Sequence, residues 1–497
     1  MNRFAILAAT LSLGASLSGP VLAQSVQTKQ YDDGGIYEGT FLNGKQHGQG
    51  TYRLPNGYEY KGQWFEGEIR GQGEARFPNG SVYVGDFQAG KPHGTGTITF
   101  ADGGSYTGEW AEGEISGEGE ITYENGTTYI GSFRGAMHHG QGRMQTADGY
   151  VYDGDWVNGM KEGTGTVTFP DGSVYEGQMV GNAREGAGKL TLPDGLVYDG
   201  TWKAGQIEGE GRLTQPSGDI YEGGLSGGKR EGQGTVTYAN GDVYQGGFVN
   251  DLREGEGTFR GTDGYSYVGQ WSEGEIEGDG RVTYPDGSVY VGPFVDGLAD
   301  TACPADAGDC DPATRSGKII YADGASYEGQ WTAGVINGRG IARYPNGLVY
   351  EGDFKAAQNH GEGKMTYADG YSYEGGWKDG MRHGQGRATY ADGTVYEGQF
   401  ADGQRHGQGR IEMPGGFSYE GQWENGEISG LGTATYATGD VYEGMFQNGR
   451  RQGQGTMRYK DGTESTGTWA AGVLPGQTVS PEETPEAPEP APAEPTE

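Results

Sequence analysis

The chain has 497 residues, of which 102 are glycine and 33% are hydrophobic, and its formal net charge is −34 at pH 7. So much glycine and so little apolar content are a poor basis for one large globular core, whereas a thin sheet needs only local packing. The excess of acidic residues argues against a nucleic-acid partner and against bulk attraction to a strongly anionic lipid surface.

Residues 1–23 have the features of a secretory signal. Arg3 precedes an apolar run over residues 4–17, and a small-residue cleavage site ends at Ala23. We therefore expect cleavage after Ala23 and an exported protein, periplasmic or secreted, with a net charge of −35 once Arg3 is removed. No cysteine follows the cleavage site, so a lipoprotein anchor is not indicated. No later apolar run approaches the ~20 residues that span a bilayer.

After a lead-in over residues 24–36, one unit of 23 residues repeats along the chain. A fixed period of this length indicates a repeat architecture. A nineteenth copy begins at Ser465, where the tyrosine is lost but Gly467 and Trp469 keep their places. The eighteen tyrosines that open the preceding units are Tyr37, Tyr60, Tyr83, Tyr106, Tyr129, Tyr152, Tyr175, Tyr198, Tyr221, Tyr244, Tyr267, Tyr290, Tyr327, Tyr350, Tyr373, Tyr396, Tyr419 and Tyr442.

Each unit has the pattern of a two-stranded hairpin, because its side chains alternate with period 2 and its glycines fall where the chain must reverse. In residues 83–87 the odd positions are aromatic or glycine, and residues 94–100 place Ile98 and Phe100 on one face and threonines on the other. Turns such as residues 78–80, Pro-Asn-Gly, suit a tight reversal. The sequence predicts an all-β fold with one apolar and one polar face.

The unit over residues 396–418, YEGQFADGQRHGQGRIEMPGGFS, resembles the MORN repeat (membrane occupation and recognition nexus), as found in an exported bacterial type of protein. The resemblance covers residues 37–476. It implies an elongated, single-layer antiparallel sheet of about 19 tandem hairpins, twisted along its length, with no catalysis in the repeats. It also implies a scaffold role, which in eukaryotic relatives is often tied to membranes. At ~4.8 Å per strand such an array would be on the order of 180 Å long.

The glycines and aromatic residues favour a packing role. Gly85 and the glycines Gly94 and Gly96 fall on the aromatic face, where a ring from a neighbouring strand can cover bare backbone and offset the weakness of glycine in a strand. The same rings could instead stack against sugars or peptides. Packing is the reading that we prefer.

A second period of 46 residues lies over the first, because the fifth position alternates between phenylalanine and tryptophan. The following loop is often acidic after tryptophan and basic or histidine-bearing after phenylalanine, with Trp156 and Trp377 as exceptions. Leu225 and Phe248 follow one another without an intervening tryptophan, and we expect a change of curvature or twist there.

All seven histidines fall in this loop, and they are predicted to be structural. Adjacent repeats should lie ~10 Å apart, whereas the ligands of one metal ion lie within about 2 Å of it. The same spacing argues against a Ser-His-Asp constellation. We therefore predict no catalytic, cofactor-binding or metal-binding residue, no cofactor, and no enzyme. The histidines are His47, His93, His138, His139, His360, His383 and His406.

An inserted loop over residues 300–316 separates a first block of repeats, residues 37–299, from a second block, residues 317–476. It contains the two cysteines of the chain, Cys303 and Cys310, and an exported chain with two cysteines predicts one disulfide between them.

The same loop carries Asp306, Asp309 and Asp311, but their spacing matches no calcium loop. Arg315 stands where a glycine is usual, so the hairpin beneath should be distorted. An insertion on a regular scaffold is a reasonable place for a specific function.

Residues 477–497 are rich in proline and glutamate and contain no aromatic residue, which predicts a disordered acidic tail. We interpret it as a solubilising or spacing segment in preference to a recognition peptide.

The sequence therefore predicts a non-enzymatic exported scaffold in the cell envelope that binds protein partners or further copies of itself, and a homo-oligomer fits this reading. The alternative is a module that binds lipid head groups or envelope glycan through its aromatic face or a basic loop edge, although peripheral membrane contact is disfavoured by charge. An exposed aromatic face is expected to be the contact surface. The candidate interaction residues are Trp377, Trp423, Arg405, His406, Arg450 and Arg451.

Overall fold

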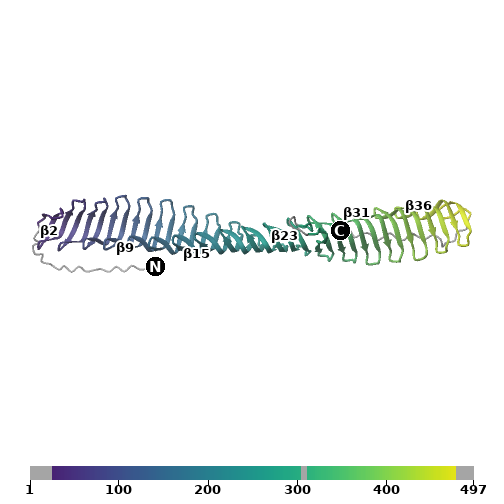
Figure 1. The fold of residues 1–497 in the computed structure, drawn as a ribbon, viewed down its shortest axis with the longest axis horizontal. Helices are drawn as coiled ribbons and strands as arrows, with labels where there is room; N and C mark the ends of the chain where they lie inside the picture. Colours follow the sequence, from purple (N-terminus) through teal and green to yellow (C-terminus); the bar gives the residue numbers. More distant parts are fainter. Residues whose placement is uncertain (1–24, 304–309, 477–497) are drawn as a thin grey trace, which may run out of the picture. The chain divides into compact units, whose positions relative to one another are not determined.

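A computed structural model of the chain describes residues 25–303 and 310–476. The predicted signal, the predicted acidic tail, and Asp306 and Asp309 lie outside these residues. The chain divides into two units, residues 1–216 and residues 217–497. In each unit the strands follow one another in chain order, and the described residues contain no α-helix (Figure 1). The fold is all-β, as predicted.

In the first unit the strands are β1 (Gln27–Gln30), β2 (Ile36–Leu42), β3 (Lys45–Arg53), β4 (Glu59–Phe65), β5 (Glu68–Arg76), β6 (Val82–Gln88), β7 (Lys91–Thr99), β8 (Ser105–Ala111), β9 (Glu114–Thr122), β10 (Thr128–Arg134), β11 (Met137–Gln145), β12 (Val151–Val157), β13 (Met160–Thr168), β14 (Val174–Val180), β15 (Ala183–Thr191), β16 (Val197–Lys203) and β17 (Gln206–Thr214).

In the second unit the elements are β18 (Ile220–Ser226), β19 (Lys229–Thr237), β20 (Val243–Val249), β21 (Leu252–Arg260), β22 (Ser266–Ser272), β23 (Glu275–Thr283), β24 (Val289–Val295), β25 (Leu298–Ala299), the short 3₁₀ helix η1 (Pro312–Thr314), β26 (Gly317–Ile320), β27 (Ser326–Thr332), β28 (Val335–Arg343), β29 (Val349–Lys355), β30 (Gln358–Thr366), β31 (Ser372–Lys378), β32 (Met381–Thr389), β33 (Val395–Ala401), β34 (Gln404–Glu412), β35 (Ser418–Glu424), β36 (Glu427–Thr435), β37 (Val441–Gln447), β38 (Arg450–Arg458) and β39 (Glu464–Trp469).

Each repeat is a hairpin of one shorter and one longer strand, and two kinds of turn alternate along the sheet. Within a repeat, β6 turns into β7 through Ala89 and Gly90, both at positive φ, as a two-residue type I′ turn requires. Between repeats, the Phe77 carbonyl accepts the Gly80 N–H at 2.9 Å, and the Asn79 side chain accepts the Ser81 N–H at 3.0 Å. The predicted hairpins and their Pro-Asn-Gly turns are therefore confirmed.

The first strand of a typical repeat contains a β-bulge that explains the Tyr-x-Gly signature. In β6 the pairing with β7 shifts between Gly85 and Phe87, which leaves Asp86 as an extra residue. The Tyr83 hydroxyl donates to the carbonyl of Asp86 at 2.9 Å. The tyrosine thus donates to the carbonyl of the bulged residue three positions later, and the same hydrogen bond recurs at Tyr60 and Tyr106.

The aromatic rings pack edge to face along one side of the sheet and cover one another, and the tyrosine rings also cover glycine backbone. The ring of Tyr83 covers Gly85 and Gly96 so closely that a Cβ at Gly96 would overlap it. Its centroid lies 5.0 Å from that of Phe87 and 5.0 Å from that of Trp110 in the next repeat. Tyr83 is 0% exposed and Phe87 is 4% exposed. The packing role predicted for the glycines is therefore confirmed for Gly85 and Gly96, whereas Gly94 has a φ of +66° and faces the Asp86 side chain. The predicted exposure of the aromatic face is wrong.

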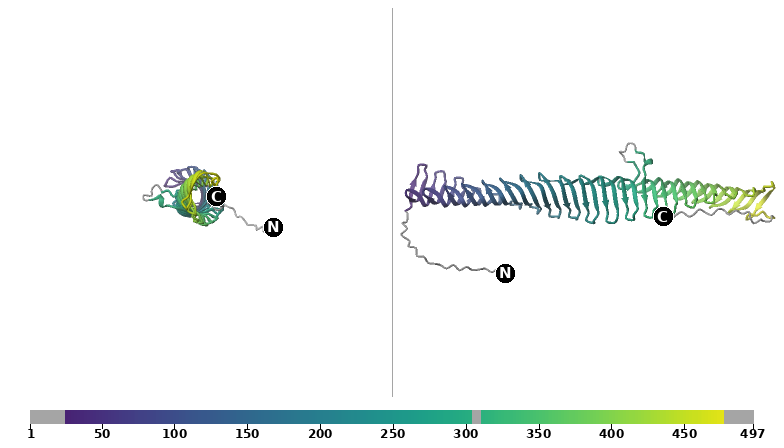
Figure 2. Two further views of the ribbon diagram at one scale, coloured as in Figure 1. Left: turned by 90° about the vertical axis from the view of Figure 1, so that its right-hand side faces the viewer. Right: turned by 90° about the horizontal axis from the view of Figure 1, so that it is seen from below.

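The insertion splits one second strand into two pieces without removing either. β25 pairs with β24, and β26 pairs with β24 on one side and β27 on the other. Thr301 donates its backbone N–H and its hydroxyl to the Trp331 carbonyl at 3.1 and 3.0 Å, so regular contacts continue to residue 301. Residues 310–316 belong to no strand and contain only η1, and Figure 2 shows the chain projecting from the side of the sheet in this part of the second unit. The distortion expected near Arg315 is seen as this interruption of the second strand, which resumes at Gly317.

The boundary between the two units, after Pro216, falls one repeat before Phe248 and just ahead of the repeat that contains Leu225. The change of curvature expected there stays a prediction. None of the described residues forms a helix with the length and apolar character needed to cross a bilayer.

Candidate interaction surface

The two tryptophans predicted to form a contact surface are buried. Trp377 is 4% exposed and Trp423 is 2% exposed. The indole Nε1–H of Trp423 donates to the Gly409 carbonyl of the preceding repeat at 3.0 Å, and its ring packs edge-on against Tyr396 at 5.1 Å. These tryptophans therefore join one repeat to the next, and the expectation that their rings are exposed on a contact surface is wrong.

Two of the predicted basic residues are buried as well, because their guanidinium groups fold back onto the next repeat. Arg405 is 7% exposed, lies 4.7 Å from the ring centroid of Trp423, and donates to the Gly426 carbonyl at 2.9 Å. Burial lowers the pKa of Arg405 from its ordinary value. Arg451 is 8% exposed and makes the same contacts with Trp469 and Gly472.

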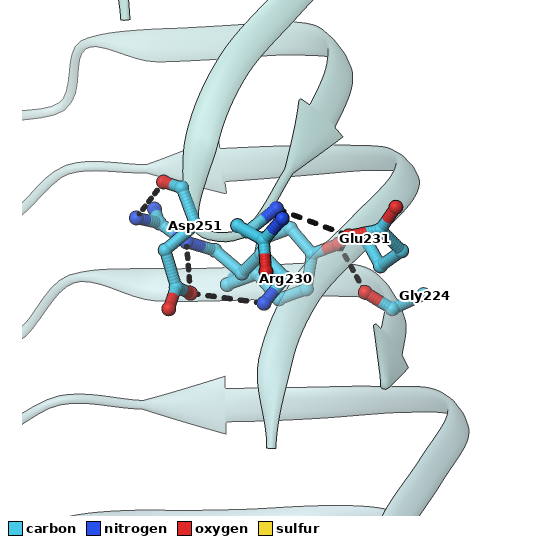
Figure 3. A network of polar contacts seen from close by, with 6 residues as sticks. Gly224, Arg230, Glu231 and Asp251 are labelled. Carbon is cyan, nitrogen blue, oxygen red and sulfur yellow. Dashed lines mark hydrogen bonds and ion pairs between the residues drawn. The ribbon is translucent and has the colours of Figure 1, made fainter. Parts of the chain in front are cut away.

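The same arginine clamp recurs elsewhere in both units. Arg230 donates to the carbonyl of Asp251 at 2.6 Å and to its carboxylate at 3.3 Å, while the neighbouring Glu231 accepts the Asn250 N–H at 3.0 Å (Figure 3). Each clamp pairs an arginine with a backbone carbonyl 21 residues later. The other arginines with this contact are Arg184 to Gly205 at 2.7 Å, Arg253 to Gly274 at 2.6 Å and Arg382 to Gly403 at 2.6 Å.

Only His406 and Arg450 of the six candidate residues are exposed. His406 follows the buried Arg405 on β34, and Arg450 precedes the buried Arg451 on β38. The predicted basic edge is thus much weaker as a surface than its sequence suggests, since half of its charge is used inside the sheet.

The histidine position of the motif holds the turn of the next repeat. The Nδ1 atom of His47 accepts the Glu66 backbone N–H at 3.5 Å, and that of His360 accepts the Asp379 N–H at 3.4 Å. In other repeats a carboxylate at this position does the same, as Glu277 does for Asp296 at 3.0 Å. The loop position expected for the histidines is wrong, because His47 is the third residue of β3 and His360 the third residue of β30. The structural role predicted for them agrees with these contacts.

His138 differs from the other histidines, because it occupies the position that the clamping arginines hold elsewhere. Its ring stacks on Tyr129 with centroids 3.7 Å apart, and its Nε2 atom lies 2.9 Å from the Tyr123 hydroxyl. Burial lowers the pKa of His138 to about 4. The imidazole is therefore neutral at physiological pH.

The structure joins Cys303 to Cys310 through a disulfide. Asp311 lies just beyond it and caps η1, since its side chain accepts the Ala313 N–H at 2.9 Å. Within residues 25–303 and 310–476, no three His, Cys, Asp or Glu side chains are grouped so that they could hold a metal ion.

The polar face of the second unit presents an alternating row of charges that the sequence reasoning missed. Lys364 stands opposite Glu374 in the sheet, with Nζ and a carboxylate oxygen 3.3 Å apart. Arg410 stands opposite Glu420, 3.9 Å away. We call this row the charge ladder: Lys364, Glu374, Arg387, Glu397, Arg410 and Glu420 follow one another on adjacent strands, and all six are exposed.

A pocket of about 290 Å³ lies over β7, lined by apolar side chains that include Pro92, Phe100 and Trp110. Of the residues described along its wall, one titrates, Tyr83, and burial raises its pKa to about 12. The pocket therefore offers no group poised for acid–base chemistry at neutral pH.

Signals for both the clamp and the ladder are present in the sequence. Arg405 precedes Trp423 by eighteen residues, as Arg184 precedes Trp202. The ladder residues occupy the polar positions of the period-2 pattern, so each stands one repeat period from a residue with the same orientation.

The comparisons with known proteins concern the repeats. A model of the MORN repeat matches 17 segments of the chain and passes over the interrupted repeat at Tyr290 and the degenerate one at Ser465. The matched segments are residues 37–57, 60–82, 83–105, 106–128, 129–149, 152–174, 175–197, 198–220, 221–243, 244–264, 267–289, 327–349, 350–370, 373–395, 396–416, 419–441 and 442–464. No curated protein matches the chain in sequence.

Among solved structures, the SAS-4 TCP domain of Drosophila melanogaster in complex with a proline-rich motif of Ana2 is 18% identical, covering 36% of this chain and 90% of that one, with a TM-score of 0.22. The TCP10 domain of Danio rerio CPAP is 16% identical, covering 44% and 92%, with a TM-score of 0.19. Virginiamycin B lyase from Staphylococcus aureus is 9% identical, covering 61% and 92%, with a TM-score of 0.10. Scores this low carry no argument about function.

Proposed function

Because the chain belongs to the MORN-repeat family, we propose that it is a non-enzymatic, exported scaffold that gathers protein partners, or further copies of itself, in the cell envelope. Export rests on the secretory features of residues 1–23. The scaffold role rests on the difference between the two faces of each strand, of which one is buried against neighbouring repeats and the other is exposed.

The observation that carries the proposal is the charge ladder. Its charges alternate in sign, as in Lys364, Glu374 and Arg387, and they lie on strands about 4.8 Å apart. A row with both signs suits a partner that carries a complementary pattern, and such patterns supply specificity more than bulk attraction does. Binding to an anionic membrane would instead require a row of exposed positive charges. Arg405 and Arg451 cannot contribute to such a row, because both are buried in clamps.

The experiment is capture of envelope proteins by the tagged, processed chain and by a variant in which Arg387 and Arg410 are both changed to glutamate. Both side chains are exposed, so the repulsion between the new glutamates and the facing Glu397 is screened by solvent, and thermal unfolding checks that the variant is folded. We expect the wild-type chain to retain specific proteins at physiological salt and the variant to lose them. Exchanging Lys45 and Lys203, two exposed lysines of the first unit, for glutamate provides a matched change of charge away from the ladder.

The alternative function, binding of lipid head groups or envelope glycan, is tested with the same proteins. Co-sedimentation with anionic liposomes and with peptidoglycan should give weak or no binding at physiological salt, where charges are screened beyond about 8 Å. Tight, salt-sensitive liposome binding that Arg450→Gln and His406→Gln abolish would overturn the scaffold proposal in favour of the lipid one.

A further inference from the structure

The last strand of the second unit is the first half of an unfinished hairpin. β39 pairs with β38, with Gly467 opposite Gly455 and Ser465 opposite Met457. The chain then turns back through a bridge between Ala470 and Val473. Pro475 follows two residues later and has no N–H to donate. Within residues 310–476 no strand pairs with the outer edge of β39.

The first strand of the first unit is the second half of a hairpin. β1 pairs with β2 in the register of a second strand, with Gln27 opposite Gly39 and Gln30 opposite Ile36. It is four residues long, and all four are exposed. No other strand within residues 25–303 pairs with β1. An open edge of this kind is a template for strand addition.

The interrupted repeat shows how two such halves fit together. Its second strand consists of β25 and β26, which are separated by the insertion, yet β26 still pairs with β24 and with β27. β26 is four residues long, like β1, and Gly317 stands opposite Gly329 as Gln27 stands opposite Gly39. The bridge between Ala470 and Val473 corresponds to the pairing of Val295 with Leu298.

We propose that copies of this chain join head to tail, with β1 of one copy pairing with β39 of another in the way that β26 pairs with β24. In that register Lys29 stands opposite Ser465, and Thr28 stands opposite Thr466, as Ile319 and Lys318 stand opposite Tyr290 and Val291. The contact is heterologous, so each added copy leaves one edge of each kind for further growth. This inference rests on the proposed scaffold function and specifies its self-association.

The side chains at the two edges depart from the repeat in ways that compensate each other. In the interrupted repeat the ring of Tyr290 covers Gly317, where it leaves no space for a Cβ. β1 has Gln27 in the place of that glycine, and β39 has Ser465 in the place of that tyrosine. The loss of the ring therefore provides the room that the glutamine needs. Leu474 takes over part of the missing cover, since its Cδ1 atom packs above Gly467.

Charge sets how the association should respond to salt. Each copy carries a large negative charge, −34 for the whole chain, so two copies repel one another at low ionic strength. The pairing itself consists of backbone hydrogen bonds, which salt does not screen. Association should therefore strengthen when salt is added, opposite to the behaviour of a contact made by complementary charges.

The first test is sedimentation velocity of the processed full-length chain across concentrations and salt. We expect a ladder of dimers, trimers and longer species that grows with protein concentration and with salt. A monomer under all conditions would overturn the proposal. So would association that appears only after residues 477–497 are deleted, because the chain's own tail would then be the occupant of the edge.

A pair of cysteine variants tests the register. Thr28→Cys with Thr466→Cys should give disulfide-linked multimers on oxidation. Thr28→Cys with Thr468→Cys should not, because Thr468 lies two residues further along the same face of β39. All three threonines are exposed, and the native cysteines are bonded to each other, so neither variant disturbs the core or the disulfide. Equal cross-linking in both variants, or none in the first, contradicts the proposed register.

A compensation test uses the two departures from the repeat. Ser465→Tyr should weaken association at least tenfold, because the new ring meets Gln27 of the incoming strand, and adding Gln27→Gly should restore it. Gln27→Gly alone should change association little. Failure of the second change to rescue the first would sink the steric argument. A chain that captures envelope proteins but stays monomeric would sink the inference and leave the scaffold function standing.

Discussion

The two faces of each strand in the second unit differ in almost every respect although they share one backbone. On one face Tyr396, Gly409 and Trp423 are buried and nearly repeat from one unit to the next. On the other, Glu397 and Arg410 are exposed, and their charges change sign from strand to strand. The buried face supplies the contacts that join neighbouring repeats of this unit, whereas the side chains of the exposed face differ more from one repeat to the next.

This contrast favours the polar face over the aromatic one as the contact surface of the proposed scaffold. An aromatic residue in a single-layer sheet is commonly taken as a contact surface, because nothing covers it from above. Here the cover comes from the side, through rings such as Tyr396 and Trp423 that lie over glycine backbone. Changes on the two faces should therefore affect different measurements.

The largest effect is expected from Trp423→Ala. Removing a side chain that is 2% exposed and donates to the Gly409 carbonyl should lower the free energy of unfolding of the second unit by about 3–5 kcal/mol. Urea denaturation of the full chain measures it. Glu420→Ala, on the opposite face three residues earlier, is the control and should stay within about 0.5 kcal/mol. Lost partner binding with unchanged stability would return Trp423 to the surface.

A smaller effect is expected from Arg405→Met, which keeps the apolar stem but removes the cation over Trp423 and the donor to Gly426. We expect a loss of about 1–3 kcal/mol, the sum of one desolvated cation–π contact and one charged hydrogen bond. Arg410→Met on the polar face is the matched control, with no expected loss beyond about 0.5 kcal/mol. Equal losses in the two variants would show that the clamp contributes nothing.

A pH dependence is expected in the first unit, from His138. Its pKa is lowered to about 4 in the folded chain against 6.5 for an unperturbed histidine, so the unfolded state binds a proton first as pH falls. The contribution of the neutral imidazole is fully present above pH 6.5 and is lost as pH falls towards 4. His138→Gln introduces the residue that Gln46 supplies at the equivalent position of another repeat. It should reduce the change in melting temperature with pH between pH 6.5 and about pH 4. An unchanged pH profile would contradict it.

The smallest effect is expected from the disulfide. Protein purified without reductant should contain no alkylatable thiol at Cys303 or Cys310, as intact-mass measurement can check. Replacing both by serine should change the free energy of unfolding of the sheet by no more than about 0.5 kcal/mol, because regular pairing ends at Thr301 and resumes at Gly317. A large loss would mean that the insertion braces the sheet.

Much of this fold could be predicted from one unit of sequence. Alternation in residues such as Tyr83 and Phe87, with glycines at the turns, specifies hairpins because strand side chains have period 2. The bulge at Asp86 could not be predicted, since a bulge adds a residue without changing the 23-residue period.

The burial of Arg405 was missed for a different reason. An arginine in a polar loop is ordinarily solvated, and its partners, Trp423 and Gly426, come within reach only when two hairpins stand side by side in register. His406, the next residue of the same strand, is exposed. Contacts within a repeat could thus be inferred from its pattern, whereas contacts between repeats required the pairing of strands.

The clamps also bear on how such a chain changes its copy number. Four of the clamping arginines lie over a tryptophan of the following repeat: Arg184, Arg253, Arg405 and Arg451. In a tryptophan-type hairpin the equivalent position holds an apolar residue, as Ile428 does opposite Trp423. Deleting or duplicating 46 residues removes or adds one phenylalanine-type and one tryptophan-type hairpin, so the two types still alternate. A change of 23 residues sets phenylalanine-type and tryptophan-type hairpins out of step. Leu225 and Phe248 follow one another without an intervening tryptophan, yet the clamp is kept there, since Arg230 lies over Phe248 at 5.0 Å, as Arg382 lies over Phe400 at 5.6 Å.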